Sequence, residues 1–164
     1  MLLDVSKVAG LGLRPRTSDD RSFLASVYAS TRADELARTN WDEAQVAAFL
    51  DFQFDAQDRH YTTNYPTCAF YVIEHDGTPC GRLYLDLWPS EARVVDISLL
   101  PRYRGRGIGS QLLEGIIAQA ARHGVPVSIH VERENPALRL YERLGFEVIE
   151  EKGVHLLMRR ALSV

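Results

Sequence analysis

Three glycines at alternate positions, Gly105, Gly107 and Gly109, constrain this chain more than any other feature. Glycine adopts backbone conformations that other residues avoid, so the chain can turn tightly here and its amides can approach a ligand. An apolar stretch precedes the glycines, and an apolar stripe at helical spacing begins with Ile108 and Leu112. The first amides of a helix lack intrahelical partners and carry the positive end of its dipole. The pattern therefore predicts a strand, a tight turn and a helix whose N-terminus binds an anion.

Two other phosphate-binding motifs rich in glycine do not fit. A P-loop ends in Gly-Lys-Ser/Thr, whereas Gly109 is followed by Ser110 and Gln111. The dinucleotide-binding fingerprint has the spacing Gly-x-Gly-x-x-Gly near a first strand, whereas the spacing here is Gly-x-Gly-x-Gly and comes late in the chain. Arg102 and Arg106 add positive charge around the turn. A glycine-rich turn with solvated arginines is the alternative to an anion site.

The N-terminal part predicts one short strand and two helices. Ser18 is a suitable N-cap for the first helix, and Asp42 for the second. We expect a strand at Leu11–Pro15, a helix from Ser18 to about Ser30, a loop or frayed helix over 31–40, a helix after Asp42 and an irregular connection over 60–67.

The remainder predicts an antiparallel meander followed by a strand–helix–strand–helix crossover. Asp76-Gly77 is a strong hairpin signal between two of the strands. We expect the strand at 125–131, which follows a helix, to run parallel to its neighbour, so the fold class is mixed α/β. The expected strands are 69–74, 81–87, 92–100, 125–131, 146–150 and 155–158, and the expected helices are 107–123 and 135–145.

The composition bounds the function. A chain of 164 residues fits one domain, and its net charge of −3 argues against binding to nucleic acid. No apolar run approaches the roughly 20 residues of a membrane span, and no signal pattern opens the chain, so we expect a cytoplasmic protein without membrane contact. Cys68 and Cys80 do not face each other across the hairpin, which predicts free thiols. The histidines and cysteines show no metal-ligand spacing, so no metal is expected.

Two blocks together resemble the GNAT superfamily of acyl-coenzyme A-dependent N-acyltransferases. Arg104-Gly-Arg-Gly-Ile-Gly109 is similar to the Arg/Gln-x-x-Gly-x-Gly/Ala motif of that family. Asn135-Pro-Ala-Leu-Arg-Leu-Tyr-Glu-Arg-Leu-Gly-Phe146 is similar to its later motif, in which asparagine opens a helix that Tyr-x-x-x-Gly-Phe closes. The resemblance implies a GNAT-like mixed α/β fold with a splayed central strand pair, in one domain over residues 1–164. It also implies transfer of an acetyl group from acetyl-coenzyme A (acetyl-CoA) to a primary amine by direct attack.

The resemblance further implies which residues bind acetyl-CoA. The main chain at the end of the strand, at Leu99 and Leu100, would bind the acetyl carbonyl and the pantetheine arm. Asn135 would contact the pantetheine, and its alternative as a plain helix cap is compatible with that role. The pyrophosphate would lie in a cradle formed by Arg104, Gly105, Arg106, Gly107, Ile108 and Gly109, called the Arg104–Gly109 cradle below.

Two residues are implied to be catalytic. Tyr141 matches the family tyrosine that protonates the departing thiolate, and a phenol with an ordinary pKa of about 10 is protonated at neutral pH. Its alternative is a core aromatic. Asp96, on the strand that enters the cradle, is the candidate base that deprotonates the acceptor amine. Its alternative is a solvated or structurally paired carboxylate, and Glu132 and His130 are weaker candidates for the base.

The acceptor site is expected between Thr31 and Thr67. Asp34 and Glu35 would attract a cationic amine, and Tyr61 and Tyr65 would line a pocket. A small-molecule amine and a peptide amine both fit this expectation, and a homodimer stays open. A non-catalytic acetyl-CoA-binding module of the same fold is the competing function.

Overall fold

The computed structural model describes residues 9–162, which form a seven-stranded sheet of order β1-β2-β3-β4-β5-β7-β6. Only β4 and β5 run parallel to each other; the other neighbouring pairs are antiparallel. This arrangement confirms the predicted mixed α/β class. The strands are β1 Leu11–Pro15, β2 Ala69–His75, β3 Thr78–Leu87, β4 Ala92–Leu99, β5 Val127–Glu132, β6 Glu147–Lys152 and β7 His155–Arg160.

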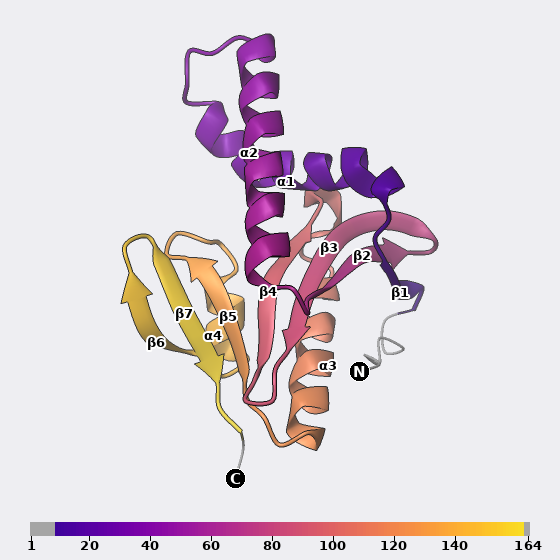
Figure 1. Cartoon of the computed structure of the whole chain (residues 1–164), viewed down its shortest axis with the longest axis vertical. Coiled ribbons are helices and arrows are strands. Elements are labelled where there is room, and N and C mark those ends of the chain that lie inside the picture. Colours follow the sequence, from indigo (N-terminus) through magenta and orange to yellow (C-terminus); the bar gives the residue numbers. More distant parts are fainter. Residues whose placement is uncertain (1–8, 163–164) are drawn as a thin grey trace.

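Helices cover both faces of the sheet (Figure 1). The helices α1 (Arg21–Leu36) and α2 (Glu43–Asn64) lie on one face, and α3 (Ile108–Arg122) and α4 (Leu138–Arg143) lie on the other. The main core lies under α3 and α4, where the apolar stripe of α3 packs against inward side chains of the central strands. A smaller core under α1 and α2 contains Leu24, Tyr28, Phe54 and Val72.

Both helices of the N-terminal half are longer than the sequence predicts. The prediction that Asp42 caps the second helix is confirmed, because its carboxylate accepts from Gln45 N at 2.8 Å. The segment 31–40, expected as a loop or frayed helix, is helical to Leu36 and non-helical after it. The irregular connection expected at 60–67 is wrong up to Asn64, where α2 ends. Burial of Leu36 and contacts of the last turns of α2 with the sheet stabilise helix where the local sequence is polar.

The hairpin between β2 and β3 turns at Asp76 and Gly77, with φ values of 51° and 78°. Such positive φ values at both central residues are typical of the tight turn that Asp-Gly predicts. A β-bulge after Ile73 places Gly81 rather than Cys80 opposite Ile73. Both cysteines are free, as predicted.

The parallel pair at the centre of the sheet separates early. In the described residues, β4 and β5 pair at three positions, of which Val94↔Ile129 is the last. Beyond that pair, β4 continues to Leu99 and β5 continues to Glu132 without pairing to each other. The two strands therefore leave an opening in the sheet, called the β4–β5 opening below.

Candidate functional site

The N-terminus of α3 offers free amides to a ligand. Its N-cap is Gly107, in the left-handed region at φ 80°, and no side chain caps the helix. The first helical hydrogen bond runs from Gln111 N to Gly107 O at 3.0 Å, so the helix does not use the amides of Ile108, Gly109 and Ser110. These amides and the helix dipole create an anion-binding position at the predicted cradle.

The space above these amides is open. A Cβ atom added to Gly105 or Gly107 would meet no other atom within 4 Å. A Cβ added to Gly109 would lie 3.9 Å from Leu140 Cδ2, so the first turn of α3 adjoins α4 next to Tyr141. The residues present therefore fit a phosphate group, because the first amides of α3 have no helical partner and the glycines before them leave open space.

The side chain of Arg104 turns from the cradle toward the end of β4. Its Nε donates to Leu99 O at 3.0 Å, and its Nη2 donates to Ser30 Oγ of α1 at 3.4 Å. Leu100 N donates to Cys80 O of β3, so the carbonyl of Leu99, in the same peptide unit, points the opposite way, toward β5. A main-chain acceptor at the predicted acetyl-CoA-binding position thus faces the β4–β5 opening.

Tyr141 lies on α4 with 4% of its surface exposed, and its ring packs edge-on against Phe146 at 6.1 Å between centroids. Its hydroxyl has no hydrogen-bond partner among residues 9–162. Every fully buried polar side-chain atom in that range has a partner, so this hydroxyl is not fully buried. The hydroxyl therefore opens onto accessible space. Burial, with a smaller effect from the charge of Asp96, raises the pKa of Tyr141 to about 12. The phenol is therefore a proton donor at neutral pH.

Asn135 precedes α4 instead of opening it, because α4 begins at Leu138. Its Oδ1 accepts from Ala137 N at 2.8 Å, and its main-chain oxygen accepts from Leu138 N at 3.1 Å. The side chain thus orders the turn before the helix through its carbonyl oxygen. Its Nδ2 group makes no hydrogen bond within the described part of the chain.

The carboxylate of Asp96 accepts four hydrogen bonds. Arg82 donates to both oxygens, at 3.3 Å and 2.8 Å. Tyr61 donates to Oδ2 at 3.0 Å and Ser98 donates to Oδ1 at 2.8 Å. This is the structurally paired arrangement that the sequence left open as the alternative to a base.

Tyr61 lies on α2, not in an irregular segment, and its hydroxyl joins α2 to β4 through Asp96. Burial, together with the charge of Asp96, raises the pKa of Tyr61 far above its usual value, so this hydroxyl stays protonated. Tyr61 also packs edge-on against Tyr84 at 5.7 Å. The sequence predicted a pocket-lining role for Tyr61 but not its bond to Asp96.

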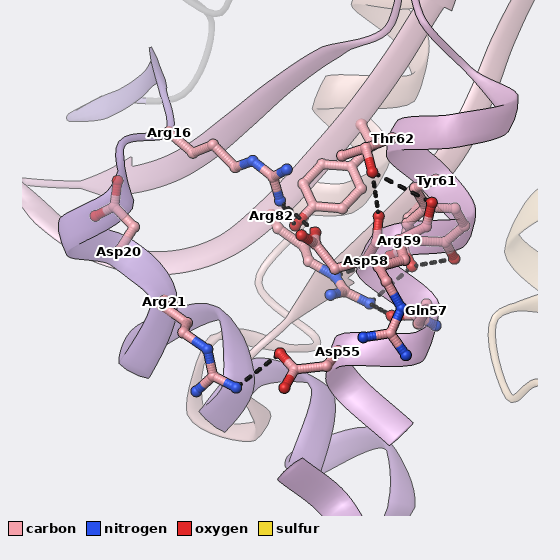
Figure 2. Close-up of polar contacts among 12 residues, drawn as sticks. Arg16, Asp20, Arg21, Asp55, Gln57, Asp58, Arg59, Tyr61, Thr62 and Arg82 are labelled. Atoms are coloured by element: carbon pink, nitrogen blue, oxygen red, sulfur yellow. Dashed lines mark hydrogen bonds and ion pairs between the residues drawn. The ribbon is translucent and has the colours of Figure 1, made fainter. Parts of the chain in front are cut away.

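A polar network that the sequence analysis missed fixes α2 on the sheet (Figure 2). Arg82, with 2% of its side chain exposed, also donates to Gln57 Oε1 at 2.9 Å. Arg16 of the β1 end donates to Asp58 Oδ1 at 2.6 Å and lies over the Phe70 ring at 4.1 Å. The available signal was the alternation in β3, where polar residues alternate with the core residues Leu83 and Leu85.

The other predicted acceptor residues are placed apart from one another. Tyr65 ends α2 and stacks on Trp88, with centroids 6.2 Å apart and rings inclined by 6°. Asp34 and Glu35 are exposed on α1. Glu35 pairs with Arg32 at 3.0 Å, and Arg32 also reaches Glu132 at the end of β5 at 3.5 Å. Arg32 therefore links α1 to the far edge of the β4–β5 opening.

Among the described residues, no helix is both long and apolar enough to cross a bilayer.

The sheet order, the parallel pair that separates, and the uncapped glycine-lined helix beside it define the fold class of the acetyltransferases. The sequence matches the Acetyltransferase (GNAT) family over residues 32–146, which is more than half of the chain. The chain belongs to the GNAT acetyltransferase family, as the two blocks indicated.

Relatives and solved structures agree with this assignment. A mycothiol acetyltransferase of Brachybacterium faecium is 38% identical over 151 residues, covering 84% of this chain and 46% of that protein. An uncharacterized N-acetyltransferase of Mycobacterium bovis is 33% identical over 109 residues, covering 63% of this chain and 68% of that protein. The chain spans less than half the length of the first curated relatives that it matches.

The fold is shared with crystal structures of low sequence identity. The PaiA N-acetyltransferase of Thermoplasma acidophilum, in complex with coenzyme A, has a TM-score of 0.69 at 18% identity and covers 92% of this chain and 98% of its own. An acetyltransferase of Thermus thermophilus has a TM-score of 0.67 at 23% identity, and the match covers 94% of this chain and 99% of that one.

Proposed function

We propose that the protein transfers an acetyl group from acetyl-CoA to an amine. The observation that carries this proposal is the uncapped N-terminus of α3, open above Gly105 and Gly107, next to strands that separate. An anion site beside a slot lined by free main-chain groups suits a substrate with a pyrophosphate and a long amide-containing arm. Membership of the GNAT family supports the same substrate.

In this proposal, the amides of the Arg104–Gly109 cradle hold the pyrophosphate. The carbonyl of Leu99 and the main chain of Leu100 pair with the pantetheine arm in the β4–β5 opening. Arg104 must then release Leu99 O and turn toward the phosphates, where its guanidinium suits two oxygens at once. Asn135 keeps the bond that its Oδ1 accepts from Ala137 N and offers its Nδ2 group to the arm.

Tyr141 supplies the proton for the departing sulfur in the proposed reaction. The amine nitrogen attacks the acetyl carbonyl, a C–N bond forms and the C–S bond breaks. The thiolate takes the phenolic proton of Tyr141, whose hydroxyl opens onto accessible space beside the cradle. The proton that the nitrogen loses on forming the amide returns through solvent to the Tyr141 phenolate. The raised pKa of Tyr141 keeps that proton available over the neutral range.

Asp96 is the sequence-based candidate for the base, and its geometry sets a condition on that role. Its oxygens already accept from Arg82, Tyr61 and Ser98. Because these bonds engage both carboxylate oxygens, one of the bonds must open before Asp96 can take a proton from the amine. Without such opening, Asp96 serves the reaction by holding Tyr61 in position.

The acceptor is proposed to be a primary amine that enters from the side of α1 and α2. Tyr61 lies in the last turn of α2 and Tyr65 follows that helix, with their ring centroids 6.4 Å apart, and the carboxylates of Asp34 and Glu35 on α1 add negative charge. One relative is named mycothiol acetyltransferase, and another is named for N-acetylation of an alanine of ribosomal protein bS18. The amine panel should therefore contain both small-molecule and protein acceptors.

A thermal-shift titration with acetyl-CoA, followed by thiol-release assays on an amine panel, tests the proposal. A ligand that binds only the folded state raises the melting temperature, and a fragment without the pyrophosphate should raise it less. A shift with thiol release confirms the enzyme. A shift with no release for any amine favours a non-catalytic acetyl-CoA-binding module, and no shift removes both.

A further inference from the structure

Arg93 of β4 lies at the closed end of the β4–β5 opening. It pairs with Ser128 of β5, one position before the last pair of that ladder. Both residues of the last pair belong to the main core, so the side chains of Arg93 and Ser128 point to the opposite face of the sheet. This is the face of α2, because Arg93 Cζ lies 4.7 Å from the ring centroid of Trp88, and Trp88 stacks on Tyr65, the C-cap of α2. Arg93 therefore adjoins the opening on the side from which the acceptor is proposed to enter.

The guanidinium of Arg93 is nearly buried but not fully paired. Arg93 has 8% of its surface exposed. Its Nε donates to Ser128 Oγ at 2.7 Å, and its Nη2 donates to Glu91 Oε2 at 3.3 Å. Its Nη1 has no hydrogen-bond partner among residues 9–162. Because every fully buried polar side-chain atom in that range has a partner, Nη1 reaches accessible space.

The acidic groups around Arg93 compensate its charge only in part. Glu91 also lies 3.7 Å from Arg159 of β7, so two arginines share one carboxylate. Asp86 is the residue opposite Arg93 on β3, but its carboxylate accepts from Thr67 at 2.6 Å, and the two described residues form no ion pair. A desolvated cation with a free donor and a shared counter-charge favours an anionic ligand.

The charge of Arg93 extends to the next outward position, where the opening begins. His130 lies two residues beyond Ser128 on β5, about 7 Å along the strand. Desolvation and then the charge of Arg93 lower the pKa of His130. Asp96 is the next residue of β4 that faces α2, as its bond from Tyr61 shows. An acceptor whose amine reaches the opening at this level can therefore place a second group beside Arg93.

From this geometry we propose that Arg93 selects an acceptor amine that also carries an anionic group, a carboxylate or a phosphate, and binds that group through Nη1; the inference rests on the proposed acetyl transfer. Trp88 holds the guanidinium by stacking against it. The rings of Trp88, Tyr65 and Tyr61 follow one another with centroids 6.2 Å and 6.4 Å apart. They offer an apolar wall to the part of the acceptor between its anionic group and its amine.

Amines in pairs that differ only in the anionic group test this selection. The pairs are 4-aminobutyrate with 4-aminobutyramide, 2-aminoethyl phosphate with ethanolamine, and a peptide with glutamate or glutamine as its second residue. The wild type should prefer the anionic member of at least one pair by about tenfold or more in kcat/KM. The preferred pair then distinguishes a free carboxylate, a phosphate and an acidic peptide. Equal kcat/KM within every pair would overturn the proposal and leave Nη1 to an ordered water.

Arg93→Gln separates selection from a structural role. The variant removes the charge but keeps an amide that can donate to Glu91, so the preference for the anionic member should fall to about one. A loss by the same factor for both members, with the preference kept, would mean a structural role and would contradict the proposal. Arg159→Gln is the matched control, because it removes the second arginine from Glu91 but leaves Arg93 in place, and the preference should persist. An equal collapse in both variants would show that overall charge, and not Arg93, selects the acceptor.

An inhibition measurement on the wild type does not depend on the folding of a variant. Butyrate for the carboxylate, or ethyl phosphate for the phosphate, carries the anionic group without the amine and should compete with the preferred amine. Inhibition that is absent, or competitive only against acetyl-CoA, would contradict the proposal. If the wild type binds acetyl-CoA but acetylates no amine of either charge, the proposed function itself fails. If it acetylates both members of every pair equally, the proposed function stands and this inference alone fails.

Discussion

Arg82 of β3 and Asp96 of β4 form a buried ion pair, with Nη2 and Oδ2 2.8 Å apart and side chains 2% and 12% exposed. The pair lies beneath α2, where Arg82 also binds Gln57 and Asp96 also binds Tyr61. Two strands of the sheet and the helix above them therefore share one charged cluster. This cluster holds α2 at the edge of the β4–β5 opening.

Arg82→Met should destabilise the protein by about 3–5 kcal/mol, because the buried carboxylate of Asp96 loses its counter-charge. Urea unfolding followed by circular dichroism measures the change. Arg21→Met is the matched control, since the pairs of Arg21 with Asp51 and Asp55 are solvent-exposed and should contribute little. Equal stability of the two variants would show that Arg82 does not stabilise the fold through Asp96.

Gly107→Glu should weaken acetyl-CoA binding at least about tenfold, or by about 1.4 kcal/mol, because a negative side chain would occupy the space above the α3 amides. Isothermal titration measures the affinity. Gly124→Glu is the control: Gly124 also has a positive φ, 69° against 80°, and also has open space, but it lies at the other end of α3. A comparable loss in both variants would point to backbone strain instead of the cradle.

Tyr141→Phe should lower kcat by about 100-fold while the acetyl-CoA affinity stays nearly unchanged, because the hydroxyl acts on the leaving sulfur and the ring fills the same core position. Single-turnover thiol release and a binding titration give the two numbers. Undiminished turnover would mean that solvent protonates the thiolate. A parallel loss of affinity would mean that the hydroxyl instead binds the ground state.

Asp20→Asn should flatten the loss of stability in acid. Its bonds from Arg14 lower the pKa of Asp20 from 3.8 to about 2. The depressed pKa stabilises the fold above the unfolded value, and this contribution disappears as the pH falls from about 4 to about 2. Melting temperatures across this range, for both proteins, measure the effect. An unchanged slope in the variant would show that other carboxylates govern acid unfolding.

Much of the site could be predicted from short stretches of sequence. The N-cap at Asp42, the turn at Asp76-Gly77 and the strand–turn–helix around Gly107 all appeared as expected, because each depends on residues a few positions apart. The lengths of α1 and α2 could not be predicted in this way. Their polar last turns are helical because partners distant in sequence, such as Asp96 for Tyr61, stabilise them.

The sequence by itself determined the family, from its two motif blocks, and the order of the elements and the glycine turn before α3, since these depend on local backbone preferences and hydrophobic periodicity. Only the tertiary structure decided which side chains meet at the β4–β5 opening. Asp96 is paired because Arg82, 14 residues away, and Tyr61, 35 residues away, converge on it. The β4–β5 ladder ends at Ile129, so His130 pairs with Leu157 of β7 but with no residue of β4. Strand register and helix docking set both outcomes, and neither is encoded in the spacing of nearby residues.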